Sequence, residues 1–379
     1  MARSHRFSIL AFLVTSLMFA LGCQAIFRQA TPSPVPTSTS TPGIPTETPA
    51  PTQEAELPPS KGWIAFVKDG DLWLIHPDGS GAQQMTHAEP AGASDLGYET
   101  IRWSREGDML AYSRNANIYI LDILSKVETL KVEDVAGGLD WTLTGRRIVY
   151  DSHIWPGGGI GSEANDGLWI ILVNARSVRR ALPVPHGARL LQRPDMADDD
   201  RYGFAWGACG DIPGSCPLFI WNVERGGAER FPIDRISACA WAPYELKMAC
   251  TRDFLAQGET SEVIVTDVYG DFLERIPASA SLEHKNILWS RDGRTLAVGY
   301  FDRTGGGATD LISLENNERR LFAKGLPLGW SPDSQWLLIA EDGYSSASKL
   351  SIVNVNTGAV YFLTNAEGYN AVWQPEVSR

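Results

Sequence analysis

Histidine is the residue type in this chain best suited to bind a transition metal. Neutral imidazole is a common ligand for such metals, and four histidines fall in segments that we expect to connect strands: His87, His153, His186 and His284. In the repeat scheme given below, all four lie on one face of the fold. A metal held there would suit an alternative function, a metal-assisted carbohydrate-active enzyme acting on acidic polysaccharide. No ligand-spacing motif accompanies these residues, so we favour surface histidines without a role and expect no metal and no cofactor.

The motifs of nucleophilic catalysis and nucleotide binding are missing from the sequence. It has no Gly-x-Ser-x-Gly nucleophile elbow and no phosphate-cradling P-loop. Glycine triplets at 157–159 and 305–307 lie between expected strands rather than before helices, which favours loops. The acidic residues Asp195 and Asp198–Asp200 could bind a cation, but such a run is more often a solvated hairpin loop. We therefore expect a protein that is not an enzyme.

The cysteines indicate disulfides. Apart from Cys23 the chain has four, an even number that is typical of disulfide-bonded exported proteins. Cys209 and Cys216 flank a short loop, and Cys239 faces Cys250 if Trp241 pairs with Met248 across a hairpin. We predict the pairs Cys209–Cys216 and Cys239–Cys250, with free buried thiols as the alternative. A zinc site is not expected, because two cysteines lie in a loop and two inside a hairpin.

The N-terminus has the pattern of an export signal. Basic residues at positions 3–6 precede an apolar run at 7–21, which has signal-peptide length and is short for a membrane span. The run ends in Ala-Leu-Gly-Cys at 20–23, which resembles a bacterial lipoprotein lipobox and implies acylation of Cys23. Ala20 and Leu21 stand in the reverse of the preferred order, so an uncleaved anchor or cleavage without a lipid stays open. Every alternative places the remaining chain outside the cytoplasmic membrane, at the cell surface or in the periplasm.

Residues 24–60 are rich in Pro and Thr and form the expected tether between the membrane and the folded domain at 61–379. Such a composition buries too little apolar surface to fold and stays extended. The formal net charge of −12 argues against a nucleic-acid partner, which would need clustered Lys and Arg.

A repeated phrase sets the fold: a strand that ends in Trp, a tight polar turn and an apolar strand. The Trp stands at positions 103, 141, 241, 289, 330 and 373. A period of about 40–50 residues with all-strand content is typical of a β-propeller. The repeated Trp and turn residues are interpreted as structural, because buried Trp packs neighbouring blades and Asp-Gly or Pro-Asp sets turn geometry.

The number and closure of the blades follow from the same pattern. Between Trp141 and Trp241 there is room for one more repeat, with a first strand at 188–192 and Gln192 at the Trp position. We therefore predict an all-β fold with seven four-stranded blades, or six if that strand does not exist. The C-terminal strand that ends in Trp373 is expected to pair with the first three strands of the domain, which removes an exposed edge.

The string from Ile64 to Gly81, with its Asp-Leu-Trp-Leu-Ile centre and Pro-Asp-Gly-Ser-Gly turn, resembles the TolB-type WD40-like (PD40) repeat. The Trp-Ser turns at 103, 289 and 330 share this resemblance, which covers nearly all of 61–379. It implies a propeller like those of periplasmic protein-binding factors, prolyl peptidases and some sugar-processing enzymes. It does not imply one activity, because such folds host unrelated functions.

One face is expected to carry the binding residues. The long insertions lie between second and third strands, at 151–166, 209–216, 252–262, 302–309 and 341–348, and loops of this kind often carry function. They present the candidate ligand-binding residues His153, Trp155, Phe254, Arg303 and Tyr344. The favoured hypothesis is a membrane-tethered, monomeric, non-catalytic module that binds or scaffolds a protein, peptide or glycan at this face or in the central channel.

Overall fold

The chain divides into two units, at Met1–Glu54 and Ala55–Arg379, and all described residues belong to the second. A computed structural model describes residues 57–59, 61–87, 98–115, 117–133, 138–142, 144–152, 167–174, 178–183, 191–199, 201–207, 216–222, 225–253, 261–278, 283–301, 306–342, 348–368 and 370–376. The predicted signal peptide, the predicted acylation site Cys23 and nearly all of the predicted tether lie outside this set. Within it, no helix is long and apolar enough to cross a membrane.

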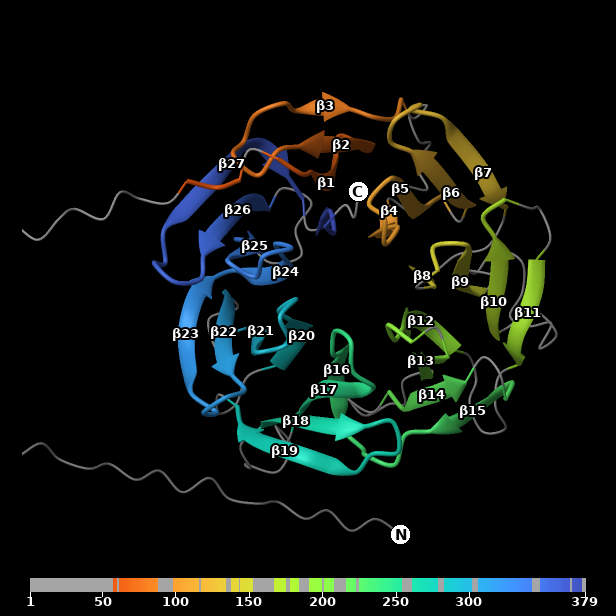
Figure 1. Ribbon diagram of the computed structural model, residues 1–379, viewed down its shortest axis with the longest axis vertical. Helices are drawn as coiled ribbons and strands as arrows, with labels where there is room; N and C mark the ends of the chain where they lie inside the picture. The colour runs from red at the N-terminus through yellow and green to blue at the C-terminus, as the bar shows by residue number, and fades with distance from the viewer. Residues whose placement is uncertain are drawn as a thin grey trace, which may run out of the picture. The chain divides into compact units, whose positions relative to one another are not determined.

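The second unit is a β-propeller of seven antiparallel four-stranded sheets, which confirms the predicted fold class (Figure 1). We number the blades from 1 to 7 and give their strands from the axis outward. The first four blades are β28 (Ala371–Trp373), β1 (Ile64–Lys68), β2 (Asp71–Ile75), β3 (Gln83–Gln84); β4 (Tyr98–Trp103), β5 (Met109–Arg114), β6 (Asn117–Asp122), β7 (Glu128–Val132); β8 (Leu139–Trp141), β9 (Arg147–Ser152), β10 (Gly167–Leu172), β11 (Val178–Pro183); and β12 (Leu191–Met196), β13 (Tyr202–Gly207), β14 (Leu218–Asn222), β15 (Gly227–Arg230).

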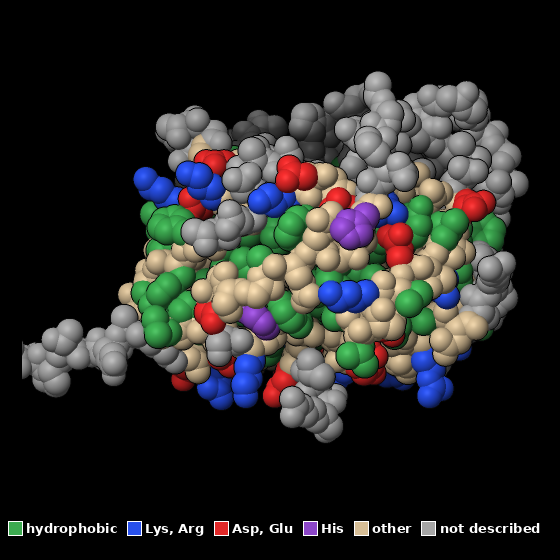
Figure 2. All heavy atoms as spheres, turned by 90° about the horizontal axis from the view of Figure 1, so that it is seen from above, with side chains coloured by type: hydrophobic (Ala, Val, Ile, Leu, Met, Phe, Trp, Pro, Cys, Tyr) green, Lys and Arg blue, Asp and Glu red, His purple; other side chains and the backbone are tan. Residues whose placement is uncertain are grey.

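The other three blades have the same order. They are β16 (Ile236–Trp241), β17 (Lys247–Arg252), β18 (Glu262–Asp267), β19 (Phe272–Pro277); β20 (Glu283–Trp289), β21 (Thr295–Phe301), β22 (Gly307–Ser313), β23 (Arg319–Lys324); and β24 (Leu326–Trp330), β25 (Trp336–Ala340), β26 (Lys349–Asn354), β27 (Val360–Glu367). The outer strands form the rim, on which apolar, basic and acidic side chains are interspersed (Figure 2).

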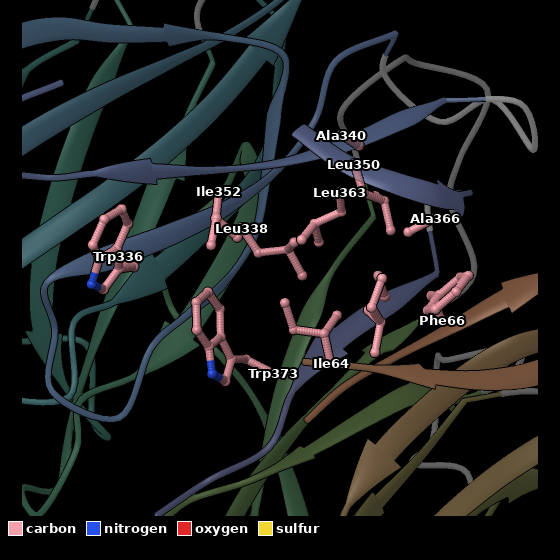
Figure 3. Close-up of a cluster of buried hydrophobic side chains, with 12 residues drawn as sticks. Ile64, Phe66, Trp336, Leu338, Ala340, Leu350, Ile352, Leu363, Ala366 and Trp373 are labelled. Atoms are coloured by element: carbon pink, nitrogen blue, oxygen red, sulfur yellow. The ribbon is translucent and has the colours of Figure 1, made fainter. Parts of the chain in front are cut away.

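The ring closes through blade 1, as the two incomplete end repeats predicted. Strand β28 from the C-terminus pairs antiparallel with β1, and Ile64 lies opposite Trp373. Phe66 and Trp373 then share one buried cluster with Trp336 and Leu338 of blade 7 (Figure 3). The first and last strands of the propeller, which are far apart in sequence, are thus joined by both main-chain pairing and apolar burial.

Five of the six recurring Trp residues join their blade to the one before it. Each of these five buried indoles donates from Nε1 to the main-chain oxygen of the residue just before the Trp position in the preceding blade. These bonds are Trp103 to Val372 (3.2 Å), Trp141 to Arg102 (3.1 Å), Trp241 to Asp195 (3.3 Å), Trp289 to Ala240 (3.1 Å) and Trp330 to Leu288 (3.4 Å). The repeat is therefore structural, because each Trp combines apolar burial with a satisfied polar group.

The turns after Trp289 and Trp330 are each fixed by a serine and an aspartate. Ser290 Oγ donates to Asp292 Oδ1 at 2.6 Å and accepts from the main-chain N–H of Thr295 at 2.9 Å. Ser331 repeats both bonds, to Asp333 and from Trp336. These polar side chains satisfy main-chain groups within the turn, which accounts for their recurrence.

Blade 4 exists, but its first strand was placed wrongly from the sequence. The strand spans Leu191–Met196, not 188–192, and Met196 rather than Gln192 occupies the Trp position. Met196 pairs with Gly203 just as Trp241 pairs with Met248 in blade 5. The register shifts between Gln192 and Asp195, and such a bulge adds residues that a period-two pattern does not anticipate.

Candidate functional site

The innermost strands leave one set of side chains partly exposed around the ring axis. These are the residues immediately before the Trp position, and we call them the axial set. Each is partly exposed, whereas the Trp, or Met196 in blade 4, that follows it is buried. In blade order the set is Val372, Arg102, Asp140, Asp195, Ala240, Leu288 and Gly329.

Charge is confined to one side of the axial set. Arg102, Asp140 and Asp195 come from the consecutive blades 2, 3 and 4, while the other four members are apolar or glycine. Arg102 Nε lies 3.9 Å from Asp140 Oδ1, and 43% of the arginine side chain is exposed. An ion pair this long and this solvated contributes little free energy. The site therefore offers a charged arc facing a mainly apolar arc.

The surrounding protein disfavours the ionised forms of both aspartates. Burial raises the pKa of Asp195 to about 8, and repulsion from Asp140 raises it further, while Arg102 opposes the change. Burial also raises the pKa of Asp140, again with Arg102 opposing. At neutral pH the two carboxyls therefore carry less than two full negative charges, and a protonated Asp195 donates a hydrogen bond instead of only accepting.

The two aspartates differ in what they bind. Asp140 Oδ2 accepts from the main-chain N–H of Met196 at 2.8 Å, so this carboxyl supports blade 4 where the usual indole is missing. Within the described ranges no hydrogen bond reaches the Asp195 carboxyl, and the bond from Trp241 uses the main-chain oxygen of Asp195. A ligand could therefore bind the Asp195 carboxyl without replacing a hydrogen bond that joins two blades, whereas binding to Asp140 Oδ2 would compete with Met196.

A second aspartate also fixes the seam between blades 3 and 4. Buried Asp151, at the end of β9, accepts at Oδ2 from the N–H groups of Gly138 (3.0 Å) and Arg193 (2.6 Å). Arg193 lies in the bulge with φ of 51°. The carboxyls of Asp140 and Asp151 therefore accept from two main-chain N–H groups of β12, the strand whose pairing with β13 is interrupted by the bulge. Both aspartates thus have a structural role, because they satisfy main-chain donors.

The acidic run at 195–200 is not the single solvated hairpin loop that the sequence suggested. Asp195 lies on an inner strand, whereas Asp198 Oδ2 accepts from Tyr244 N at 3.2 Å and Asp199 caps the turn before β13.

Sequence reasoning missed the pairing of Asp140 with Asp195. Their shared position, one residue before the Trp position in consecutive repeats, could not be identified from the sequence, because the bulge in β12 and Met196 at the Trp position hide the register of blade 4.

The predicted loop-face residues His153, Trp155, Phe254, Arg303 and Tyr344 lie outside the described residues. Strands that lead into these loops are described: Arg252 pairs with Glu262, and Phe301 pairs with Gly307, at the ends of their hairpins. Because the strands of every blade run antiparallel, second-to-third connections emerge on the same face as blade-to-blade connections. The expectation that those five side chains bind a ligand stays a prediction.

Two of the four candidate metal-binding histidines are described, and they have different surroundings. His87 is exposed, with Nδ1 3.1 Å from Gln84 Nε2. His284 is not the surface residue that we expected, because its side chain is 1% exposed and its Nδ1 lies 2.6 Å from Asp253 Oδ1. His153 and His186 lie outside the described residues. Among the residues that are described, no three His, Cys, Asp or Glu gather to hold a metal ion.

Cys239 and Cys250 form the disulfide that the hairpin register predicted. They are cross-strand partners of β16 and β17 with a Cα–Cα distance of 4.2 Å. Cys216 is also disulfide-bonded, and its predicted partner Cys209 lies outside the described residues. The bond at β16 and β17 ties the inner two strands of blade 5, next to the axial residue Ala240.

Comparison with known proteins supports the fold alone. No protein-family model and no curated protein sequence matches the chain. Solved structures that it resembles include TolB from Acinetobacter baumannii, at 12% identity and a TM-score of 0.52 over 84% of this chain and 67% of that one.

Two other similar structures are enzymes. One belongs to a study of two prolyl endopeptidases (12% identity, TM-score 0.56). The match covers 80% of this chain and 50% of that one. The other is oligogalacturonate lyase from Vibrio parahaemolyticus (11% identity, TM-score 0.54), with 81% of this chain and 86% of that one covered. At these identities the likeness supports the β-propeller fold and decides no activity.

Proposed function

We propose that this protein is an extracytoplasmic, membrane-tethered binding or scaffold module. In this proposal Cys23 carries the lipid, residues 24–60 form the tether, and the propeller holds a protein, peptide or glycan without catalysing a reaction. The observation that carries the proposal is the axial set, in which Arg102, Asp140 and Asp195 face Ala240, Leu288 and Val372 across one ring.

The axial set suits recognition of a group with a polar end and an apolar body. Leu288 and Val372 offer partly exposed apolar surface, and Asp195 donates or accepts a hydrogen bond according to its protonation state. The inner strands are fixed by sheet pairing and by the Trp bonds between blades, so little conformational freedom remains to be lost on binding. Such pre-organisation lowers the entropic cost of association.

The acidic balance of the chain narrows the partner classes. A formal net charge of −12 disfavours nucleic acid, because backbone binding depends on clustered cations. A protein, peptide or glycan with amino or hydroxyl groups matches the charged arc better. The similar structures are consistent with binding but do not select it, since they include TolB as well as two enzymes.

A matched pair of arginine variants tests the proposal. The full chain is purified in detergent and used to capture envelope proteins and glycans from its source cells. Arg102→Gln changes the axial set, while Arg105→Gln changes an exposed turn residue three positions after Arg102. Support would be a specific partner retained by the wild type and Arg105→Gln but lost from Arg102→Gln. A partner retained equally by all three contradicts use of the axial set, and failure of every form to retain one contradicts the binding function.

A further inference from the structure

The outer strand of blade 6 is basic, although the chain as a whole is acidic. Strand β23 reads Arg-Arg-Leu-Phe-Ala-Lys, with three cations and no acid, in a protein whose formal net charge is −12. It is the last strand of its sheet, and no further described strand pairs with its outer side. The edge therefore offers main-chain N–H and C=O groups in a basic setting.

Apolar side chains are exposed along this part of the rim. Leu321, in the middle of β23, is 70% exposed, and on the neighbouring outer strand β27 Val360 is 48% and Phe362 is 63% exposed. Figure 2, seen from above the view of Figure 1, shows apolar and basic side chains close together at its left end, the side on which Figure 1 places β27. Charged side chains usually protect an edge strand against pairing, so a strand added to this edge would have to neutralise its cations.

Contacts on the inner side hold β23 in place. Arg320 Nη2 donates to the main-chain oxygen of Val355 in blade 7 at 2.6 Å, and its guanidinium lies 5.1 Å from the Phe322 ring centre. Arg319 Nε lies 3.7 Å from Oδ2 of buried Asp310. Phe322 and Ala323 pack against a buried cluster that includes residues of blades 6 and 7. The edge is therefore an ordered template, which reduces the conformational cost of adding a strand.

We propose that the outer edge of β23 binds an extended, acidic segment of a partner protein as a fifth strand of blade 6. Main-chain hydrogen bonds give such strand addition its affinity, and alternate side chains give its specificity. An apolar partner side chain would cover Leu321, and partner carboxylates would lie near Arg319, Arg320 and Lys324. The surface lies on the rim rather than in the axial set, so this inference goes beyond the proposed function and can fail without it.

The positive charge of β23 favours an acidic partner segment over a second copy of the chain. Antiparallel pairing of two β23 edges would bring six cations together, since each edge has three, and like charges opposite one another are destabilising. A bulge between Thr309 and Asp310 leaves Phe322 as the extra residue of β23, so the regularly paired part next to the turn is Arg319–Leu321. The added segment is therefore short, and charge contributes much of its affinity.

The test uses a short fluorescent peptide of alternating Glu and Val, with a peptide of alternating Lys and Val as control. Binding to the full chain in detergent is measured by fluorescence anisotropy at low and at physiological salt. Leu321→Glu removes the apolar contact and adds a repelling charge. Leu130→Glu is the matched control, because Leu130 is a 40% exposed residue of β7, the outer strand of blade 2.

We expect the Glu peptide to bind at least about tenfold more tightly than the Lys peptide and to weaken with salt. Leu321→Glu should reduce that binding at least about tenfold, Leu130→Glu should leave it unchanged, and amide hydrogen exchange in β23 should slow on binding. No binding of the Glu peptide, equal binding of both peptides or equal loss in both variants would overturn the proposal. A concentration-dependent dimer that excludes the peptide would assign the edge to a second copy and would overturn it equally.

Discussion

The main-chain N–H of Met196 donates to Asp140 Oδ2 at 2.8 Å across the seam between blades 3 and 4. Most other seams of the ring are bonded by an indole, and here a methionine occupies the Trp position and has no side-chain donor. The Asp140 carboxyl on the preceding blade accepts this bond, so the donor lies on the later blade here as it does in the indole bonds. Asp140 thereby joins two blades through its side chain, whereas the axial residues that accept indole bonds do so through their main-chain oxygens.

Replacing Asp140 should distinguish this bond from the charge of the residue. Asp140→Ala leaves the Met196 N–H without its acceptor, and we expect unfolding free energy to fall by about 1–3 kcal/mol. Asp140→Asn keeps an acceptor and removes repulsion with Asp195, so its stability should stay near or above that of the wild type. Urea unfolding of the three proteins measures this; equal losses in both variants would show that charge, not the hydrogen bond, matters.

Stability should fall as the pH rises from about 4 to about 8 because of Asp195. Its pKa in the folded protein is raised to about 8 from an ordinary 3.8, so the protonated form is favoured by folding. The stabilisation is complete below about pH 4 and is lost as the pH rises through about 8. Asp195→Asn removes this titration, and thermal unfolding across that range should show its advantage over the wild type growing with pH. A constant difference between the two proteins would contradict the raised pKa.

The indole bonds between blades predict a contrast between two tryptophans. Trp289→Phe removes the 3.1 Å bond to the Ala240 oxygen, and beyond the loss of packing we expect a cost of about 1 kcal/mol. Among the residues that the structure describes, buried Trp73 Nε1 has no hydrogen-bond partner, so Trp73→Phe loses no such bond. Chemical denaturation should therefore show the larger loss at position 289. The reverse order would argue that the indole bonds do not hold blades together.

The disulfide between β16 and β17 should stabilise blade 5 modestly. Its cysteines are 11 residues apart, and in the chain-entropy account a loop of this size contributes about 2–3 kcal/mol. The double variant Cys239→Ala, Cys250→Ala leaves Cys216 untouched and should unfold at correspondingly lower urea. A variant as stable as the wild type would mean that sheet pairing alone already limits the unfolded chain.

The architecture could be predicted because Trp spacing and turn chemistry recur in six of the seven inner strands. Blade 4 shows where that signal ends, since its bulge and its Met at the Trp position hide the register. The Cys239–Cys250 bond followed from register alone. The axial set could not be found from residue type, because Asp140 and Asp195 become neighbours only when consecutive blades close around the axis. The burial of His284 against Asp253 also depends on contacts between blades that periodicity does not describe.

Photo-crosslinking in the source cell tests the binding function most directly. A benzoylphenylalanine is placed at Ala240, a partly exposed member of the axial set, or at Leu124, a 95% exposed turn residue that serves as control. The account predicts that irradiation yields a discrete adduct from position 240 and none from position 124. No adduct from position 240, in a protein that is folded and exported, would contradict a partner held at the ring axis.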